Sequence, residues 1–212
     1  MAVYDLEEQE RIDALKDWWE TNRVVILGVA GVLVATVAGY FGWKAWQHSQ
    51  LVKAESLYKS FTKVVDQRDA TKLPEATAPL LEQTAGTFQA TSAALLSAKT
   101  AFEAKDFAGA RKSLEWMIDK GVADLRPIAR LRLAQVLLEE KKYDEALKVL
   151  DQIKEESFIA LASDVKGDVL MAKGSKDEAR LAWQAAVEKA GERSAIKQVA
   201  QIKLDAVGGV AK

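Results

Sequence analysis

Few residues in this sequence of 212 are of the types that carry catalysis or bind metals. Cysteine is missing from it, which excludes a disulfide framework, a thiol nucleophile and a cysteine-ligated zinc or iron–sulfur site. The single histidine, His48, excludes a multi-histidine metal site, and no carboxylate cluster accompanies it. Carboxylates such as Glu139, Glu140 and Glu155 fall on solvent-facing helix positions. We therefore expect no catalytic, cofactor or metal site, and a protein that is not an enzyme.

The elements that hold the remaining side chains are expected to be helices. Glycine (12 residues) and proline (3 residues) together make up about 7% of the chain, against an average near 12%. Alanine, leucine, lysine and glutamate, which favour helices, are abundant. The formal net charge is −1, whereas a protein that binds nucleic acid needs a basic surface. These features predict an all-α protein with no nucleic-acid partner.

The strongest physical signal is the uncharged stretch at residues 24–43, VVILGVAGVLVATVAGYFGW. As a helix, its 20 residues span about 30 Å, the thickness of the hydrocarbon core of a bilayer. The 23 residues before it contain seven acidic and three basic side chains, unlike the short basic leader of a cleaved signal peptide. We predict an uncleaved transmembrane signal-anchor in the lipid bilayer. Aromatic residues flank it as in interfacial belts: Trp18, Trp19, Tyr40, Phe41, Trp43 and Trp46.

Two features of the span leave alternatives open. Three basic residues lie close before it and four lie close after it, so the positive-inside rule selects neither orientation. Gly31, Ala35 and Gly39 recur every four residues, a spacing that lets a second membrane helix approach closely. Small residues are also common in membrane helices generally, so this contact is a hypothesis.

Residues 44–86 are expected to form a stalk and a connecting segment. The part at 44–68 continues without a helix breaker, and its apolar residues fall on one helical stripe. The part at 69–79 contains two of the three prolines and predicts a turn, followed by a short helix at about 80–84. His48 lies on the stalk, where an interfacial polar role is favoured over a catalytic one.

The rest of the sequence repeats. Three segments align on an alanine, and each has a small residue twelve positions earlier. The aligned pairs are Ala98 with Ala110, Ala134 with Ala146, and Gly167 with Ala179. The alanines lie 36 and 33 residues apart, which is close to the period of 34 of tetratricopeptide repeats. Each pair predicts two antiparallel helices that pack closely at small residues. A capping box is predicted at Ser175–Glu178, and a final helix at 194–207 would cap the stack.

We therefore predict an all-α fold with a single transmembrane helix, followed by a tetratricopeptide-like α-solenoid of about three helical hairpins plus a capping helix. The expected parts are an acidic N-terminal tail (1–23), the transmembrane helix (24–43), the stalk and connecting segment (44–86) and the repeat domain with its cap (87–212).

The first helices of stacked repeats line a concave groove, which is the candidate site for a protein partner. The predicted groove has a mixed surface of apolar residues and a few polar ones, with Asp164 and Asp168 at one end. Alternatively, some of these side chains, Phe102 and Leu138 above all, are buried in the packing. The groove positions taken from the alignment are Leu95, Lys99, Phe102, Leu131, Gln135, Leu138, Asp164, Asp168 and Met171.

The whole chain resembles the ancillary SecYEG translocon subunit (YfgM) family of Gram-negative bacteria. The resemblance rests on the acidic tail, the glycine-rich span and two phrases, RLRLAQVLL at 130–138 and KGDVLMAKG at 166–174. It implies an inner-membrane protein with a cytoplasmic N-terminus and a periplasmic repeat domain. The implied partners are the SecYEG translocon, a PpiD-like periplasmic chaperone and secreted client polypeptides.

The resemblance implies two functions. The first is a membrane-anchored periplasmic scaffold that associates with the SecYEG translocon and assists the handover of secreted or outer-membrane proteins to periplasmic chaperones through protein–protein contacts. The alternative is an anchored adaptor in envelope stress signalling or envelope assembly that acts through its cytoplasmic tail.

Overall fold

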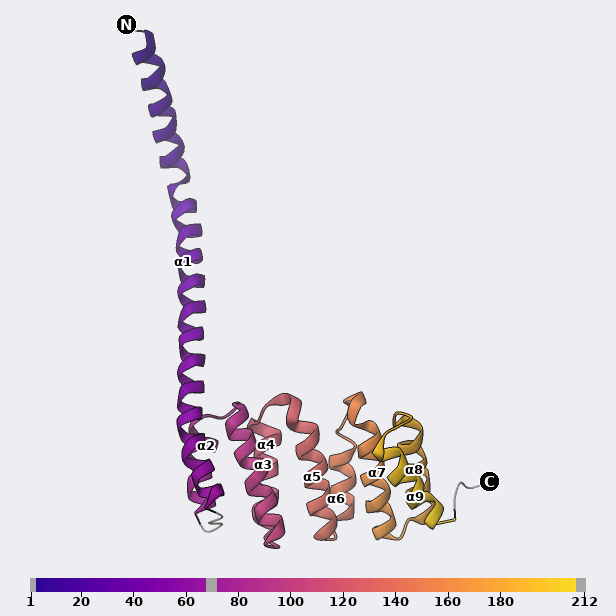
Figure 1. Cartoon of the computed structure of the whole chain (residues 1–212). Coiled ribbons are helices and arrows are strands. Elements are labelled where there is room, and N and C mark those ends of the chain that lie inside the picture. Colours follow the sequence, from indigo (N-terminus) through magenta and orange to yellow (C-terminus); the bar gives the residue numbers. More distant parts are fainter. Residues whose placement is uncertain (1–2, 68–71, 209–212) are drawn as a thin grey trace. The chain divides into compact units, whose positions relative to one another are not determined.

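The computed structural model describes residues 3–67 and 72–208, with side chains from Glu8 onward. Every regular element in these ranges is a helix (Figure 1). The chain divides into two compact units, Met1–Gln50 and Leu51–Lys212. The helices are α1 (Val3–Asp66), α2 (Leu73–Gln83), α3 (Phe88–Glu103), α4 (Phe107–Lys120), the short 3-10 helix η1 (Ala123–Leu125), α5 (Arg126–Glu139), α6 (Tyr143–Leu150), α7 (Glu156–Lys173), α8 (Lys176–Lys189) and α9 (Ala195–Ala206).

The first unit is the N-terminal part of α1. Its apolar window has a mean hydropathy of 2.3, and none of that window is buried against other parts of the protein. By length and composition this helix can cross a membrane, as the sequence predicts. A Cβ atom added at Gly31 or Gly39 would meet no atom within 4 Å. The proposed helix–helix contact at Gly31, Ala35 and Gly39 therefore stays a prediction.

The last turns of α1 belong to the second unit. Phe61 of α1 is buried in a cluster with Leu73 and Leu80 of α2 and Ala90 and Ala93 of α3. The apolar stripe of the stalk thus packs on the first helices of the domain, because its aromatic and aliphatic side chains remove apolar surface from water there.

The turn predicted at 69–79 is wrong for residues 73–79, which are helical in α2. Pro74 lies in the first turn, where a backbone N–H has no helical partner to lose. Pro79 lies inside the helix, which is held in place by the burial of Leu73 and Leu80 on both sides of it. Residues 68–71 lie outside the described ranges.

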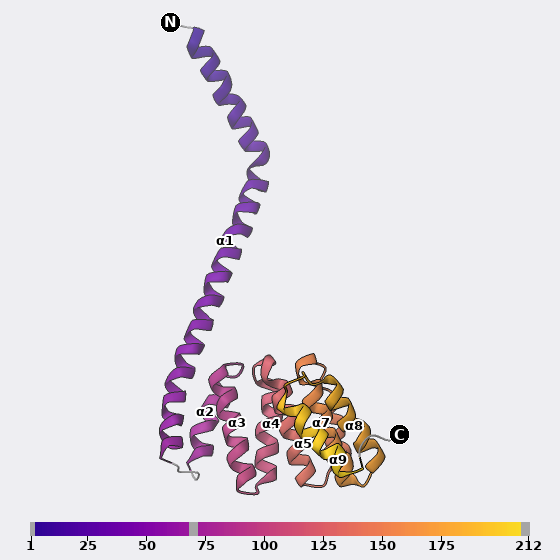
Figure 2. The same cartoon turned by 45° about the vertical axis from the view of Figure 1, so that its right-hand side comes forward.

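The predicted hairpins are confirmed as α3 with α4, α5 with α6 and α7 with α8, which follow one another in a row (Figures 1 and 2). The alanines on which the repeats align are fully buried, and their small partners in the first helices are buried as well. One core cluster extends from α3 to α7 and joins the three hairpins. This is the continuous core expected of stacked repeats, each of which buries its apolar face against its neighbours.

The ends of the hairpins follow local backbone rules. Gly174 ends α7 with φ +94°, a left-handed conformation that glycine adopts without strain. The Asp106 side chain accepts a hydrogen bond from the Gly109 N–H at the start of α4. The capping box predicted at Ser175–Glu178 is wrong, because the Ser175 side chain makes no cap hydrogen bond. Instead, the Ser175 backbone N–H donates to the Leu170 carbonyl (2.9 Å).

The capping helix is confirmed as α9. The Ser194 side chain caps its start by accepting a hydrogen bond from the Ile196 N–H. Ala200 and Leu204 are buried, and Leu204 joins a cluster with Leu170 of α7 and Trp183 of α8.

Candidate partner groove

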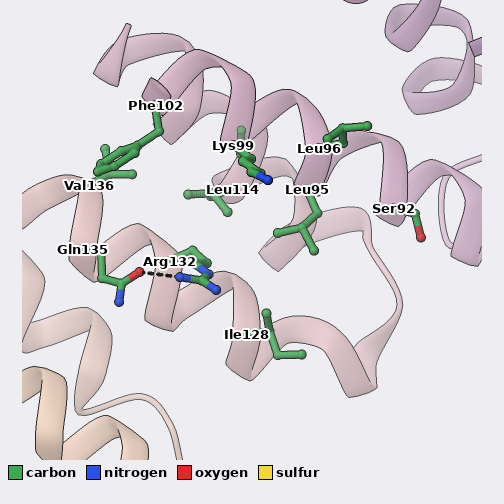
Figure 3. Close-up of a pocket in the computed structure, with 11 residues that line it drawn as sticks. Ser92, Leu95, Leu96, Lys99, Phe102, Leu114, Ile128, Arg132, Gln135 and Val136 are labelled. Atoms are coloured by element: carbon green, nitrogen blue, oxygen red, sulfur yellow. Dashed lines mark hydrogen bonds between the residues drawn. The ribbon is translucent and has the colours of Figure 1, made fainter. Parts of the chain in front are cut away.

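An open pocket of about 440 Å³ lies between α3 and α5, the first helices of the first two hairpins (Figure 3). Its volume lies within the range of ligand-binding clefts. The lining side chains are Ser92, Leu95, Leu96, Ala98, Lys99 and Phe102 of α3, Leu114 of α4, and Ile128, Arg132, Gln135 and Val136 of α5.

The pocket has an apolar floor and partly exposed apolar walls. Leu114 and Val136 are buried beneath it, where they belong to the core cluster. Leu95 and Ile128 are half-buried on opposite sides. Phe102 is 36% exposed at one end, and its ring lies 5.6 Å from the ring of Phe107 in the next helix. Apolar side chains of a partner would lose water contact on entering this space.

Two cations lie along the pocket. The Arg132 guanidinium donates a hydrogen bond to the Gln135 side-chain oxygen (2.9 Å), as Figure 3 shows. Within the described residues, no carboxylate lies within 4.0 Å of Arg132. The Lys99 ammonium lies 3.8 Å from the Glu103 carboxylate, and both of these side chains are largely exposed. The pocket is therefore an apolar site with a positive rim.

The structure brings together four of the nine predicted groove residues: Leu95, Lys99, Phe102 and Gln135 line the pocket. Leu131, also predicted to face the groove, is only 5% exposed and lies in the core. Leu138 packs against the same core and does not line the pocket. Their burial follows from the packing of α5 between its neighbouring helices.

In the third hairpin, Asp164 and Asp168 face a cation that the repeat alignment does not include. The Lys203 ammonium of α9 lies 2.9 Å from both Asp164 carboxylate oxygens and 2.8 Å from the Asp168 carboxylate. The Trp183 indole N–H lies 3.2 Å from the Asp164 carbonyl oxygen and 3.3 Å from the Asp168 carboxylate. The two carboxylates predicted at the negative end of the groove are thus paired with one cation, which offsets part of their charge. Met171 is half-buried beside Leu170 and Trp183.

Burial and pairing shift two pKa values in this cluster. Burial raises the pKa of the Asp164 carboxyl, and the hydrogen bond from Lys203 only partly opposes this. For Lys203, burial alone would lower the pKa of the ammonium, but its hydrogen bonds to Asp168 and Asp164 outweigh it and the pKa is raised. The cluster joins α9 to α7, which is a structural role at the end of the stack.

Sequence reasoning missed Ile128 and Arg132, which line the α5 side of the pocket. The alignment assigned the same positions to every first helix. A pocket between two helices is bordered by opposite flanks of each, so α5 contributes a different set of positions from α3. The intervals of four and three residues that separate Ile128, Arg132 and Gln135 could have indicated that these residues share one face of α5. No cluster of metal-ligating side chains occurs in the part of the chain that the structure describes.

Comparisons with known proteins agree with this architecture. The sequence profile of the tetratricopeptide repeat-like domain family matches residues 16–209. The ancillary SecYEG translocon subunit of Haemophilus influenzae is 32% identical over 207 residues, covering 96% of this chain and 98% of the relative. The protein of the same name from Escherichia coli is 30% identical over 214 residues, covering 97% and 98%. The chain therefore belongs to the ancillary SecYEG translocon subunit (YfgM) family and carries its tetratricopeptide repeat-like domain.

Proposed function

We propose that this protein is a membrane-anchored scaffold that associates with the SecYEG translocon and assists the handover of secreted or outer-membrane proteins to periplasmic chaperones. The names of the relatives support the association with the translocon. The apolar segment of α1 supports a single membrane anchor. The observation that carries the proposal is the open pocket between α3 and α5, whose mostly apolar lining supports a role in binding part of another protein.

In this function the N-terminus is cytoplasmic and the repeat domain is periplasmic. Secreted chains leave the channel on the periplasmic side, so this orientation puts the pocket where such chains emerge. A PpiD-like chaperone and the secreted clients are the proposed partners of the domain, and the small-residue face at Gly31, Ala35 and Gly39 is a proposed contact for a neighbouring membrane helix. The protein acts by binding, and it is proposed to be a non-enzymatic scaffold.

Co-purification from mild detergent tests this function. The tagged full-length protein is expected to recover the SecY, SecE and SecG subunits together with a PpiD-like chaperone, each identified with its own antibody. Recovery of cytoplasmic regulators without channel subunits would contradict the proposal and favour the adaptor that acts through its tail.

A pair of matched variants then separates the pocket from the rest of the surface of the repeat domain. Leu95→Glu places a charge in the pocket, whereas Leu181→Glu places one on α8, where Leu181 is 64% exposed and outside the pocket. We expect Leu95→Glu to reduce the recovery of the chaperone or of an arrested secreted chain, and Leu181→Glu to leave both unchanged. Equal effects of the two variants would contradict a role for the pocket.

A further inference from the structure

The apolar side of the pocket formed by α3 has a regular spacing. Phe88, Ser92, Leu95, Lys99 and Phe102 follow one another at intervals of four and three residues, so they lie along one face of the helix. The last four line the pocket, and Phe88, one turn before Ser92, is 63% exposed. From Phe88 to Phe102 this face extends about 21 Å. The structure thus exposes a seam of three large apolar groups with two polar positions between them.

The opposite side of the pocket has the same kind of spacing. Ile128, Arg132 and Gln135 are separated by four and three residues on α5. In Figure 3 these three residues lie across the pocket from those of α3, and both helices run in the same direction across the view. The pocket is therefore a trough between two helices, each of which presents a seam with helical spacing.

The spacing favours a helical ligand over an extended one. The apolar groups of α3 recur every seven residues, which is about 10.5 Å along the helix axis. A partner helix presents side chains on one face at the same interval of seven residues, so each of its anchors meets a matching group. An extended peptide presents side chains on one face about every 6.8 Å, so when one of them lies opposite Phe88 the next two fall about 3–4 Å to either side of Leu95.

The positively charged side chains of the pocket indicate which kind of residue a ligand should carry at its centre. Lys99 lies between Leu95 and Phe102 on one side, and Arg132 lies on the other. Arg132 has only the neutral Gln135 side chain as its polar partner among the described residues, and Lys99 has an exposed partner at 3.8 Å. A carboxylate on the ligand would meet the Arg132 guanidinium, whose paired N–H groups bind carboxylates in a bidentate manner.

We propose that the pocket binds an amphipathic α-helix of a partner protein, with an apolar seam at three- and four-residue spacing and an acidic residue at its centre. This inference rests on the proposed function, because it names the class of segment that the pocket holds.

The test uses the full-length protein in detergent and fluorescent designed peptides of about 18 residues, or five helical turns. The first peptide carries leucines at alternating spacings of three and four with a central glutamate, and the second has a central lysine instead. A third has the composition of the first in scrambled order, and a fourth is an extended, proline-containing apolar peptide. We expect the glutamate helix to bind about tenfold tighter than the lysine helix, since an opposed charge replaces a like charge beside Arg132.

Protein variants test whether binding occurs at this site. Arg132→Glu is expected to reverse the preference, so that the lysine helix binds more tightly than the glutamate helix. Phe88→Gln should weaken both helices about fivefold, because it removes an apolar anchor. Lys112→Glu, at an exposed position on α4 outside the pocket, and Leu181→Gln serve as matched controls and should change nothing. The circular dichroism spectra should be unchanged throughout, because all four side chains are exposed or half-exposed.

The outcomes distinguish the two proposals. Preferential binding of the extended peptide, with sensitivity to Arg132→Glu, would overturn the helical ligand while leaving the pocket as a binding site. Equal binding of the glutamate helix and its scrambled version would also overturn the inference. Binding of no peptide would overturn the inference, and recovery of the translocon by the same preparation would show that the scaffold function survives it.

Discussion

Gly167 of α7 lies directly beneath the indole of Trp183 of α8, and replacing this glycine tests the packing of the third hairpin. A Cβ atom at position 167 would lie 2.4 Å from two ring atoms of Trp183 and 2.7 Å from a third. These distances are too short for carbon atoms, so the ring must move. Trp183 is 3% exposed, and its N–H donates to Asp164 and Asp168, so movement breaks the packing and the hydrogen bonds together.

The size of the effect follows from three contributions. Alanine in place of glycine inside a helix favours folding by about 1 kcal/mol. Overpacking of a core opposes it by about 1–3 kcal/mol, and the loss of the indole hydrogen bonds opposes it by about 1 kcal/mol more. We predict that Gly167→Ala destabilises the domain by about 2 kcal/mol, which lowers the midpoint of thermal unfolding by about 4–8 °C. The measurement is circular dichroism of the full-length protein in detergent.

A double mutant supplies the control. The first two hairpins pair Ala98 with Leu114 and Ala134 with Leu150 at the positions of Gly167 and Trp183. In a Trp183→Leu background, Gly167→Ala should therefore be neutral or stabilising, with a coupling of about 2 kcal/mol between the two sites. If Gly167→Ala is neutral or stabilising in the wild-type background, the close contact with Trp183 does not exist and the reasoning is refuted.

Two further predictions concern the cap and the topology. Lys203→Met should destabilise the domain by about 1–3 kcal/mol at pH 7, because it leaves the buried carboxylate of Asp164 and the half-buried carboxylate of Asp168 without their cation. Since the folded-state pKa of Lys203 is raised, its contribution is complete below its unfolded value of 10.5 and is lost as the pH rises through the folded value. Since the pKa of Asp164 is also raised, protonation of this carboxyl at acidic pH should reduce the difference in unfolding free energy between the wild type and the variant. A difference in unfolding free energy that does not change with pH would refute the ion cluster. For the topology, a single cysteine is placed at Ala2 or at Ala211 of the cysteine-free chain, and cells with a permeabilised outer membrane are treated with an impermeant thiol reagent. Only the cysteine at position 211 should be labelled. Labelling at position 2 alone would show the opposite orientation.

The repeats were predictable from the sequence because close packing of two helices requires a small residue on each helix. Such residues therefore recur in the sequence as pairs at a fixed spacing, for example Ala134 with Ala146. The helix at Pro79 was not predictable from local propensity, since burial of Leu80 in the tertiary structure decides it. Which residues line the groove is also decided by the tertiary structure. Only the positions of adjacent helices show that Leu131 is buried while Arg132 lines the pocket.

The ion cluster shows the same limit at longer range. Asp164 and Lys203 are 39 residues apart, and the alignment of repeats does not pair a first helix with the capping helix. The charges along α7 alone therefore indicate an acidic groove, whereas in the folded chain a lysine of α9 pairs with both carboxylates and offsets part of that charge.

Site-specific photocross-linking from the pocket tests the central claim most directly. A photoreactive phenylalanine at Leu95 is compared with one at Leu181, which is exposed on α8 outside the pocket. Cells hold a secreted chain arrested in the channel, and the products are probed for that chain and for a PpiD-like chaperone. The scaffold predicts cross-links to these proteins from Leu95 and none from Leu181; cross-links of equal yield from both positions, or from Leu181 alone, would contradict it.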